Sequence, residues 1–467
     1  MDRIRAFFAP VKASTDEYEP IADGDADTLE GSTFEEGAPF SWLKYSVFAL
    51  IGMAMLWAWN MFLAAAPYFN IRFQADPWIS ANSQSAILTT FTAVSLVTLL
   101  ILAGRQASAN YPARVSAALI INAGVFSLLT LSTSSFLDAS PPVYLAFLLL
   151  MVAMTAFAAG LMQNGAFSFA ASFGQPEYTQ AIMAGQGVAG ILPPLAQILS
   201  FLAFDDSSSS APGQPGGEAH PAPPSSPSPP PPDNGNKGSS AAFIYFLTAV
   251  LISTATLVAF IPLVRSQARR KTAPGHAAPP PARRYVPLGT LLRKLRWLAA
   301  AVVTCFALTM FFPVFTAKIL SVHDPTAGAG AGAGRLFAPG AFIPLGFFFW
   351  NLGDLAGRVS TLLPCCSLRR RPRLLFALAL LRGAILPLYL LCNLHGRGAV
   401  VESDVFYLGV VQVLFGLTNG WVGSSAMMAA GEWVAEGERE AAGGFMGLCL
   451  VAGLAVGSVL SFSAAGV

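Results

Sequence analysis

Hydrophobic residues form long, nearly unbroken runs along this chain, and short stretches rich in polar residues, Gly and Pro separate the runs. A helix needs roughly 20 apolar residues to cross a bilayer, which matches these runs. A transmembrane β-barrel would instead show alternating segments of about ten residues. The pattern predicts eleven membrane-spanning helices, over residues 43–67, 84–104, 113–133, 142–172, 179–204, 241–264, 297–318, 338–363, 374–394, 404–430 and 441–465.

The composition excludes a soluble protein. Of the 467 residues, 54% are hydrophobic and 11% are charged, and the mean hydropathy is +0.58. Soluble domains carry about 25% charged residues, so this chain lacks the polar residues that a soluble surface needs. We therefore expect an all-α polytopic membrane protein surrounded by the lipid bilayer.

Charge is unevenly distributed along the chain. Residues 1–41 hold ten acidic and three basic residues, whereas residues 265–296 hold nine Lys or Arg and no acid. The basic segment and the arginines within 369–373 fall on one side of the membrane if the spans alternate. The positive-inside rule then places the N-terminus in the cytosol, and an odd number of spans places the C-terminus outside the cell or in a lumen.

Three segments outside the spans have compositions that disfavour a packed fold. We expect residues 1–41 to form a disordered, acidic cytosolic tail, and residues 205–240, which are rich in Ser and Pro, to form a disordered loop. Residues 265–296 are expected to form a basic cytosolic linker, which either sets the topology or also binds anionic lipid.

Charged residues inside the spans are few. Asp354 and Arg358 lie four residues apart in the eighth span, hence on one helix face, and Arg382 lies in the ninth. A charge at the bilayer centre costs about 2.5–3.5 kcal/mol on insertion scales, so each needs a partner or a wet cavity. The pair either locks two helices together or lines a solute path. We favour the second role for Asp354 and Arg358, and a structural or gating role for Arg382.

Other polar groups interrupt the apolar spans. Trp59 and Asn60 lie deep in the first span, where an indole could stack on a planar solute. Gln163, in the fourth span, offers donors and acceptors either to a solute or to a neighbouring helix. Helix packing or gating is the role expected for Gly185, Gln186 and Asn419.

No pattern in the sequence suggests catalysis. The four His residues lie outside the predicted spans or at their ends, and no phosphate-binding loop of the type GxxxxGK[ST] occurs. The five cysteines show no metal-ligand spacing. We expect no enzymatic activity, no cofactor, no metal site and no nucleic-acid partner.

Several sequence blocks, in family order, resemble motifs of the equilibrative nucleoside transporters (solute carrier family 29), in a form similar to the fungal or protist branch. They are WNMFLAAAPYF at 59–69, LMQNGAFSFA and YTQAIMAGQGVAG within 161–190, FFFWNLGDLAGRVST at 347–361, and FGLTNGWVGSSAMM at 415–428 followed by residues 440–462. The resemblance implies a major-facilitator-like fold of two bundles, with six helices in residues 42–264 and five in residues 297–467. It also implies facilitative transport of nucleosides by alternating access, with nucleobases accepted by some members.

The resemblance implies a substrate site between the two bundles. Trp59 would lie beside the base, Gln163 would bond to the base, and Asp354 and Arg358 would lie near the sugar. Leu56 and Leu63, one turn to either side of Trp59, would complete the apolar wall, with Asn60 as a polar neighbour. Two features depart from the family: Ala58 replaces a Pro, and the Ser/Pro-rich loop follows the fifth helix where animal members have their large loop after the sixth.

Two other functions stay open on the sequence. One is the transport of another small polar solute, such as a sugar or a drug, on the same architecture, and the other is a polytopic membrane protein that does not transport. We expect a monomer in the plasma membrane or in an internal membrane such as that of the vacuole.

Overall fold

The computed structural model describes residues 40–106, 109–136, 138–204, 234–272, 285–323, 334–461 and 463. Within these ranges the regular structure is helical, and the one β contact is an isolated bridge between Ile319 and Leu394. The predicted all-α class is therefore confirmed. Nearly all of the predicted tail 1–41, most of the loop 205–240 and part of the linker 265–296 lie outside the described residues.

Two helices of the first half, α4 and α5, begin at residues whose side chains cap them. Asp76 and Asn110 accept hydrogen bonds from backbone N–H groups in the first turns of α4 and α5, and each is followed within two residues by a Pro. Only Ala65 separates α2 from α3, so the two form one span. The helices are α2 (Trp42–Ala64), α3 (Ala66–Arg72), α4 (Pro77–Gly104), α5 (Tyr111–Ser135), α6 (Pro141–Ala171), α7 (Pro176–Phe204) and α8 (Asn234–Thr272).

The second half contains more irregular helices. The ninth predicted span is α-helical up to Leu381 and then narrows to a 3₁₀ segment that contains Pro387, a residue without a backbone N–H. The elements are α9 (Leu288–Thr309), α10 (Phe311–Thr316), α11 (Pro339–Ser360), α12 (Pro372–Leu381), the 3₁₀ segment η4 (Arg382–Leu391), the π-helical segment η5 (Phe406–Gln412), α13 (Val413–Ala429) and α14 (Arg439–Ser461).

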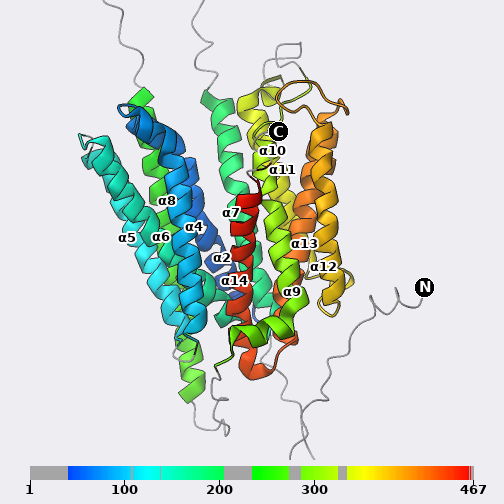
Figure 1. Cartoon of the computed structure of the whole chain (residues 1–467). Coiled ribbons are helices and arrows are strands. Elements are labelled where there is room, and N and C mark those ends of the chain that lie inside the picture. The colour runs from blue at the N-terminus through cyan, green and yellow to red at the C-terminus, as the bar shows by residue number, and fades with distance from the viewer. Residues whose placement is uncertain are drawn as a thin grey trace, which may run out of the picture.

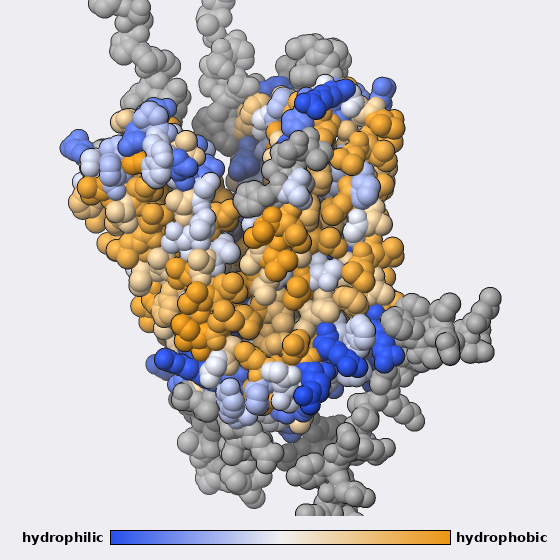
Figure 2. All heavy atoms as spheres, viewed as in Figure 1, coloured by the Kyte–Doolittle hydropathy of each residue, from blue (hydrophilic) through white to orange (hydrophobic). Residues whose placement is uncertain are grey.

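All eleven predicted spans correspond to helices. Ten helical stretches of the described chain are long and apolar enough to cross a membrane. The remaining long helix, α11, is not among these ten, and it carries Asn351, Asp354 and Arg358. Figure 2 shows a broad hydrophobic surface around the middle of the molecule and hydrophilic residues towards both ends. These features are those of a multi-pass membrane protein.

The two halves of the chain form two groups of helices. Figure 1 shows α4, α5, α6 and α8 on one side and α9, α12 and α13 on the other, with α2, α7 and α14 nearer the centre. Across the boundary, α7 packs on α11 and α14 packs on α6. The central helices therefore form the junction between the halves.

Two helix pairs approach so closely that only a glycine fits at the contact. A Cβ on Gly185 of α7 would lie 1.9 Å from the carbonyl oxygen of Ala49 in α2. A Cβ on Gly420 of α13 would lie 1.9 Å from the carbonyl oxygen of Asp354 in α11. Small residues allow such backbone contacts between membrane helices. As a result, α13 lies directly against the segment of α11 that carries Asp354.

Helix α8 is longer than its predicted span. It begins at Asn234, inside the predicted loop 205–240, and ends at Thr272, inside the predicted basic linker 265–296. Helix α9 likewise begins within that linker, at Leu288. Long basic side chains can keep their charges in the polar headgroup region, so a helix does not have to end where the apolar run ends.

Candidate functional site

A cavity of about 370 Å³ lies between the two halves and is lined by helices from both. Most of its lining is apolar, and a few polar side chains project from α6, α7, α11 and α13, which is the usual construction of a small-molecule site. The lining includes Met55, Leu56, Trp59, Phe91, Gln163 and Gln186 from the first half, and Phe306, Thr309, Trp350, Asn351, Asp354, Arg358, Asn419, Leu450 and Leu454 from the second. We refer to this space as the central cavity.

Asp354 and Arg358 form a buried ion pair in the wall of the central cavity. One turn apart on α11, they are joined by a hydrogen bond of 2.6 Å from Arg358 Nε to Asp354 Oδ2. Asn419 Nδ2 donates to the other carboxylate oxygen at 2.7 Å, and Asn419 Oδ1 accepts from Thr309 Oγ1 at 2.7 Å. The carboxylate is therefore both paired and hydrogen-bonded, which is how a buried charge is tolerated.

Arg358 also joins the two halves of the molecule. Its Nη1 donates to the carbonyl oxygen of Met183 at 2.7 Å and to Gln186 Oε1 at 3.3 Å, and both acceptors belong to α7. Gln180 of α7 donates in turn to the carbonyl oxygen of Arg358 at 3.0 Å. The guanidinium thus binds a carboxylate of its own half and the backbone of the other half. Any separation of α7 from α11 at this level must break these bonds.

The first-half wall of the central cavity carries Trp59, Leu56 and Gln163. The indole of Trp59 packs against the ring of Phe91 in α4, with centroids 4.2 Å apart and planes at 35°. Gln163 is 6% exposed, and its Nε2 has no hydrogen-bond partner. An aromatic surface and an amide on one wall, with an ion pair in the other, can hold a small molecule that is both planar and polar.

Two residues predicted for the site lie elsewhere. Leu63 is 55% exposed and Asn60 is partly buried, and neither lines the central cavity. Asn60 Nδ2 donates to the carbonyl oxygen of Ala189 at 2.9 Å. Asn60 therefore ties α2 to α7, on the same pair of helices that meets at Gly185.

Arg382 lies behind the wall of the central cavity rather than in it. Its Nη1 donates to the carbonyl oxygen of Cys305 at 2.7 Å, and its Nε donates to Thr418 Oγ1 at 3.2 Å. The guanidinium also lies over the ring of Phe415, 4.8 Å from its centroid. These contacts connect the start of η4 to α9 and α13.

Sequence reasoning missed several residues that line the central cavity. They include Phe91, Phe306, Trp350 and Leu450. Apolar residues in apolar helices carry no sign that separates a cavity face from a lipid face. Trp350 is the exception, because it precedes Asp354 by four residues and therefore shares its helix face.

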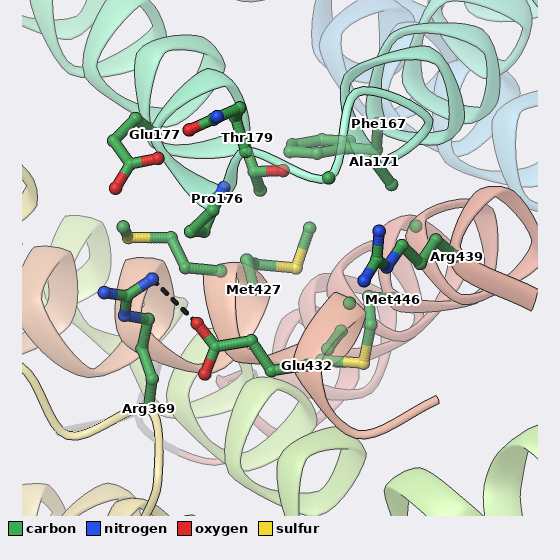
Figure 3. A pocket seen from close by; sticks show the side chains of 16 residues that line it. Phe167, Ala171, Pro176, Glu177, Thr179, Arg369, Met427, Glu432, Arg439 and Met446 are labelled. Carbon is green, nitrogen blue, oxygen red and sulfur yellow. Dashed lines mark hydrogen bonds and ion pairs between the residues drawn. The ribbon is translucent and has the colours of Figure 1, made fainter. Parts of the chain in front are cut away.

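A second, smaller pocket of about 190 Å³ lies where the turn between α6 and α7 meets the segments around the end of α13 and the start of α14 (Figure 3). Glu177 approaches it from α7, and Arg369 and Glu432, which also line it, form an ion pair of 2.7 Å with each other. Beside it, a Cβ on Gly443 of α14 would lie 2.5 Å from the carbonyl oxygen of Phe167 in α6. The two halves are thus in close contact at this end of the helices.

The sequence is similar to those of known nucleoside transporters. The family model described as "Nucleoside transporter" matches residues 149–213 and 264–465. The chain is 31% identical to the nucleoside transporter FUN26 of Saccharomyces cerevisiae, over 90% of this chain and 83% of that protein. It is 24% identical to human equilibrative nucleoside transporter 1, over 89% of this chain and 95% of that protein.

The fold itself is similar to that of a transporter of the major facilitator superfamily. The structure of FucP in its outward conformation matches with a TM-score of 0.53 and 13% sequence identity, covering 91% of this chain and 92% of that one. The predicted major-facilitator-like arrangement is therefore confirmed.

Proposed function

The chain belongs to the nucleoside transporter family, and we propose that it moves nucleosides across a membrane by facilitated transport through the central cavity. The family match confirms the resemblance carried by the sequence blocks, and it identifies a transporter rather than an enzyme. The main support for the central cavity as the binding site is its lining. An ion pair, amides and a tryptophan line the same space between the two halves.

In the proposed site, Trp59 stacks on the base, Gln163 bonds to the base, and Asp354 with Arg358 bonds to the sugar hydroxyls. A carboxylate suits this last role because each ribose hydroxyl is a donor as well as an acceptor, and a carboxylate has more than one lone pair on each oxygen. Leu56 contributes apolar wall. Leu63 and Asn60 are left out of the proposed site because they lie outside the cavity.

The proposed cycle is alternating access, in which the two halves close on one side of the substrate and open on the other. Close packing of α14 against α6 at Gly443 supports a state that is shut at that end. Opening there would require α6 and α14 to part and the bonds of Arg358 to α7 to break. No covalent step and no ATP are needed.

The direct test is the uptake of radiolabelled uridine and adenosine into proteoliposomes that contain the purified chain. We expect uptake that saturates with substrate and stops when internal and external concentrations are equal. Unlabelled nucleosides should compete, whereas sugars should not. Folded protein that gives no more uptake than empty liposomes, or uptake that only sugars inhibit, would rule the proposal out.

Trp59→Ala should weaken uridine binding by roughly 5- to 150-fold, because stacking a base on an aromatic ring contributes about 1–3 kcal/mol. The measurement is the concentration of uridine that gives half-maximal uptake. The matched control is Trp78→Ala, which removes an indole that is 70% exposed and lies outside the cavity. Equal uptake by both variants and the wild type would remove Trp59 from the site.

We propose a cytosolic N-terminus and an extracellular or lumenal C-terminus, since the positive-inside rule predicts them. We also propose a monomer, two bundles over residues 42–264 and 297–467, residence in the plasma or vacuolar membrane, and nucleobases as additional substrates. Accessibility of engineered cysteines on the two sides of the membrane would test the orientation.

A further inference from the structure

Two adjacent cysteines lie in the connection between α11 and α12. All five cysteines of the chain are free thiols, but Cys305, Cys392 and Cys449 are buried among the helices. Cys365 is exposed, Cys366 is partly exposed, and their sulfur atoms lie 3.7 Å apart. These two are therefore the thiols that a reactant from outside the molecule can reach.

Exposed apolar side chains lead from the last turn of α11 towards the cysteine pair. Val359 is 47% exposed, Leu362 is 37% exposed and Leu363 is 53% exposed. In a multi-pass membrane protein, exposed apolar side chains at the end of a span are covered by lipid rather than by protein. Because only Pro364 separates Leu363 from Cys365, the exposed thiol lies next to this lipid-covered surface.

Basic residues follow directly after the pair. Four arginines lie within the eight residues after Cys365, namely Arg369, Arg370, Arg371 and Arg373. Bases at the membrane surface are attracted to anionic headgroups and mark the cytosolic side. The chain thus changes from apolar to basic across the pair, which puts the thiols at the boundary of acyl chains and headgroups on the side proposed above as cytosolic. Juxtamembrane cysteines of this kind are typical sites of reversible S-acylation.

The connection that carries the pair is held to α13 and to the segment after it. Trp421 Nε1 donates to the carbonyl oxygen of Cys366 at 2.8 Å. Trp433 Nε1 donates to the carbonyl oxygen of Arg369 at 3.1 Å. These bonds fix the backbone beside the thiols, so the pair stays at the surface of the helix bundle.

The two thiols are not equivalent. Cys365 is the more exposed of the two. The hydrogen bond with Cys365 is the main cause that raises the pKa of Cys366. Since the thiolate is the nucleophilic form of cysteine, a raised pKa makes Cys366 the less reactive partner. Exposure and ionisation both favour Cys365 as the group that reacts.

We propose that Cys365 is a site of S-acylation, at which a long-chain fatty acid is attached through a thioester bond. The acyl donor is a fatty acyl thioester of coenzyme A. The sulfur of Cys365 attacks the carbonyl carbon of the donor, and the bond from that carbon to the sulfur of coenzyme A breaks. Coenzyme A leaves as a thiol, having taken up the proton that Cys365 lost, so no oxidant or reductant is needed. The attached chain enters the lipid beside Leu362 and Leu363.

The test is an acyl-exchange assay on the full-length chain, expressed in a eukaryotic host cell. Free thiols are blocked with N-ethylmaleimide, thioesters are cleaved with hydroxylamine, and the thiols released in this way are coupled to a maleimide-linked polymer. We expect the wild-type chain to migrate more slowly on a gel after hydroxylamine treatment, by the mass of one polymer. The shift should be lost in Cys365→Ser and retained in Cys366→Ser, the matched control one residue away.

Three results would overturn the proposal. The first is a wild-type chain that shows no shift after hydroxylamine treatment, and the second is a shift that persists in Cys365→Ser. The third is a pair of thiols that dithiothreitol releases and hydroxylamine does not, which would indicate a disulfide between Cys365 and Cys366. The assay detects the modification without measuring transport, so its result is separate from that of the uridine uptake experiment.

Discussion

Asp354→Ala is expected to reduce nucleoside uptake at least 100-fold and to lower the thermal stability of the protein markedly. The substitution leaves the buried guanidinium of Arg358 without its carboxylate and leaves Asn419 Nδ2 without its acceptor. Breaking a buried ion pair by removing one partner typically costs about 3–5 kcal/mol. Uptake into proteoliposomes and the unfolding midpoint of the detergent-solubilised protein are the two measurements. Wild-type values for both would contradict the placement of Asp354 in the site.

A double variant separates the two roles that this ion pair could have. Asp354→Asn with Arg358→Gln removes both charges, keeps a polar side chain at each position and leaves no unpaired ion. If the pair contacts the substrate, the double variant should regain most of the stability lost by Asp354→Ala and still fail to transport. Recovery of transport along with stability would show that the pair serves only to lock the helices.

Gly185→Ala is expected to impair folding strongly, although it adds only a single methyl group. The added Cβ would lie 1.9 Å from the carbonyl oxygen of Ala49, which is a backbone atom of α2 and cannot turn aside. Overpacking usually costs 1–3 kcal/mol, and a clash with backbone should reach about 3 kcal/mol or more. We expect a lower yield of monodisperse protein and a lower unfolding midpoint.

Gly124→Ala is the matched control for this prediction. Gly124 lies within α5, and a Cβ built on it meets no atom within 4 Å. Replacing a helical glycine by alanine where there is space should stabilise the helix by about 0.5–1 kcal/mol. If the two variants unfold at the same temperature, the close contact between α2 and α7 does not constrain the fold as the structure indicates.

Hydrophobic run length predicted the membrane spans well because the bilayer imposes it directly. Even α11, the least apolar span, was found, since its charges are spaced by a full helical turn and do not interrupt the run for long. The helix ends were harder to predict. Helix α8 continues to Thr272, past the end of its apolar run, and composition marks the end of the run rather than the end of the helix.

Part of the cavity lining was predictable, where polar residues stand in apolar surroundings. Asp354, Arg358 and Gln163 were identified in this way, and all three line the central cavity. Helical periodicity was not sufficient to place Leu63. It lies on nearly the same face of α2 as Leu56 but about 10 Å further along the axis, beyond the cavity. The spacing of residues in a helix gives the face they occupy, whereas the depth of a cavity depends on the neighbouring helices.

The low hydropathy of α11 has a consequence for the synthesis of this protein. A helix with an aspartate and an arginine is a poor candidate for entering the lipid by itself, at about 2.5–3.5 kcal/mol for each charge near the centre. Asn419, whose amide donates a hydrogen bond to the Asp354 carboxylate, lies 65 residues later in the chain. Stable membrane insertion of α11 during translation should therefore follow the emergence of α13 from the ribosome. The earlier helix α7 can bind the guanidinium of Arg358 before that point, through the carbonyl oxygen of Met183.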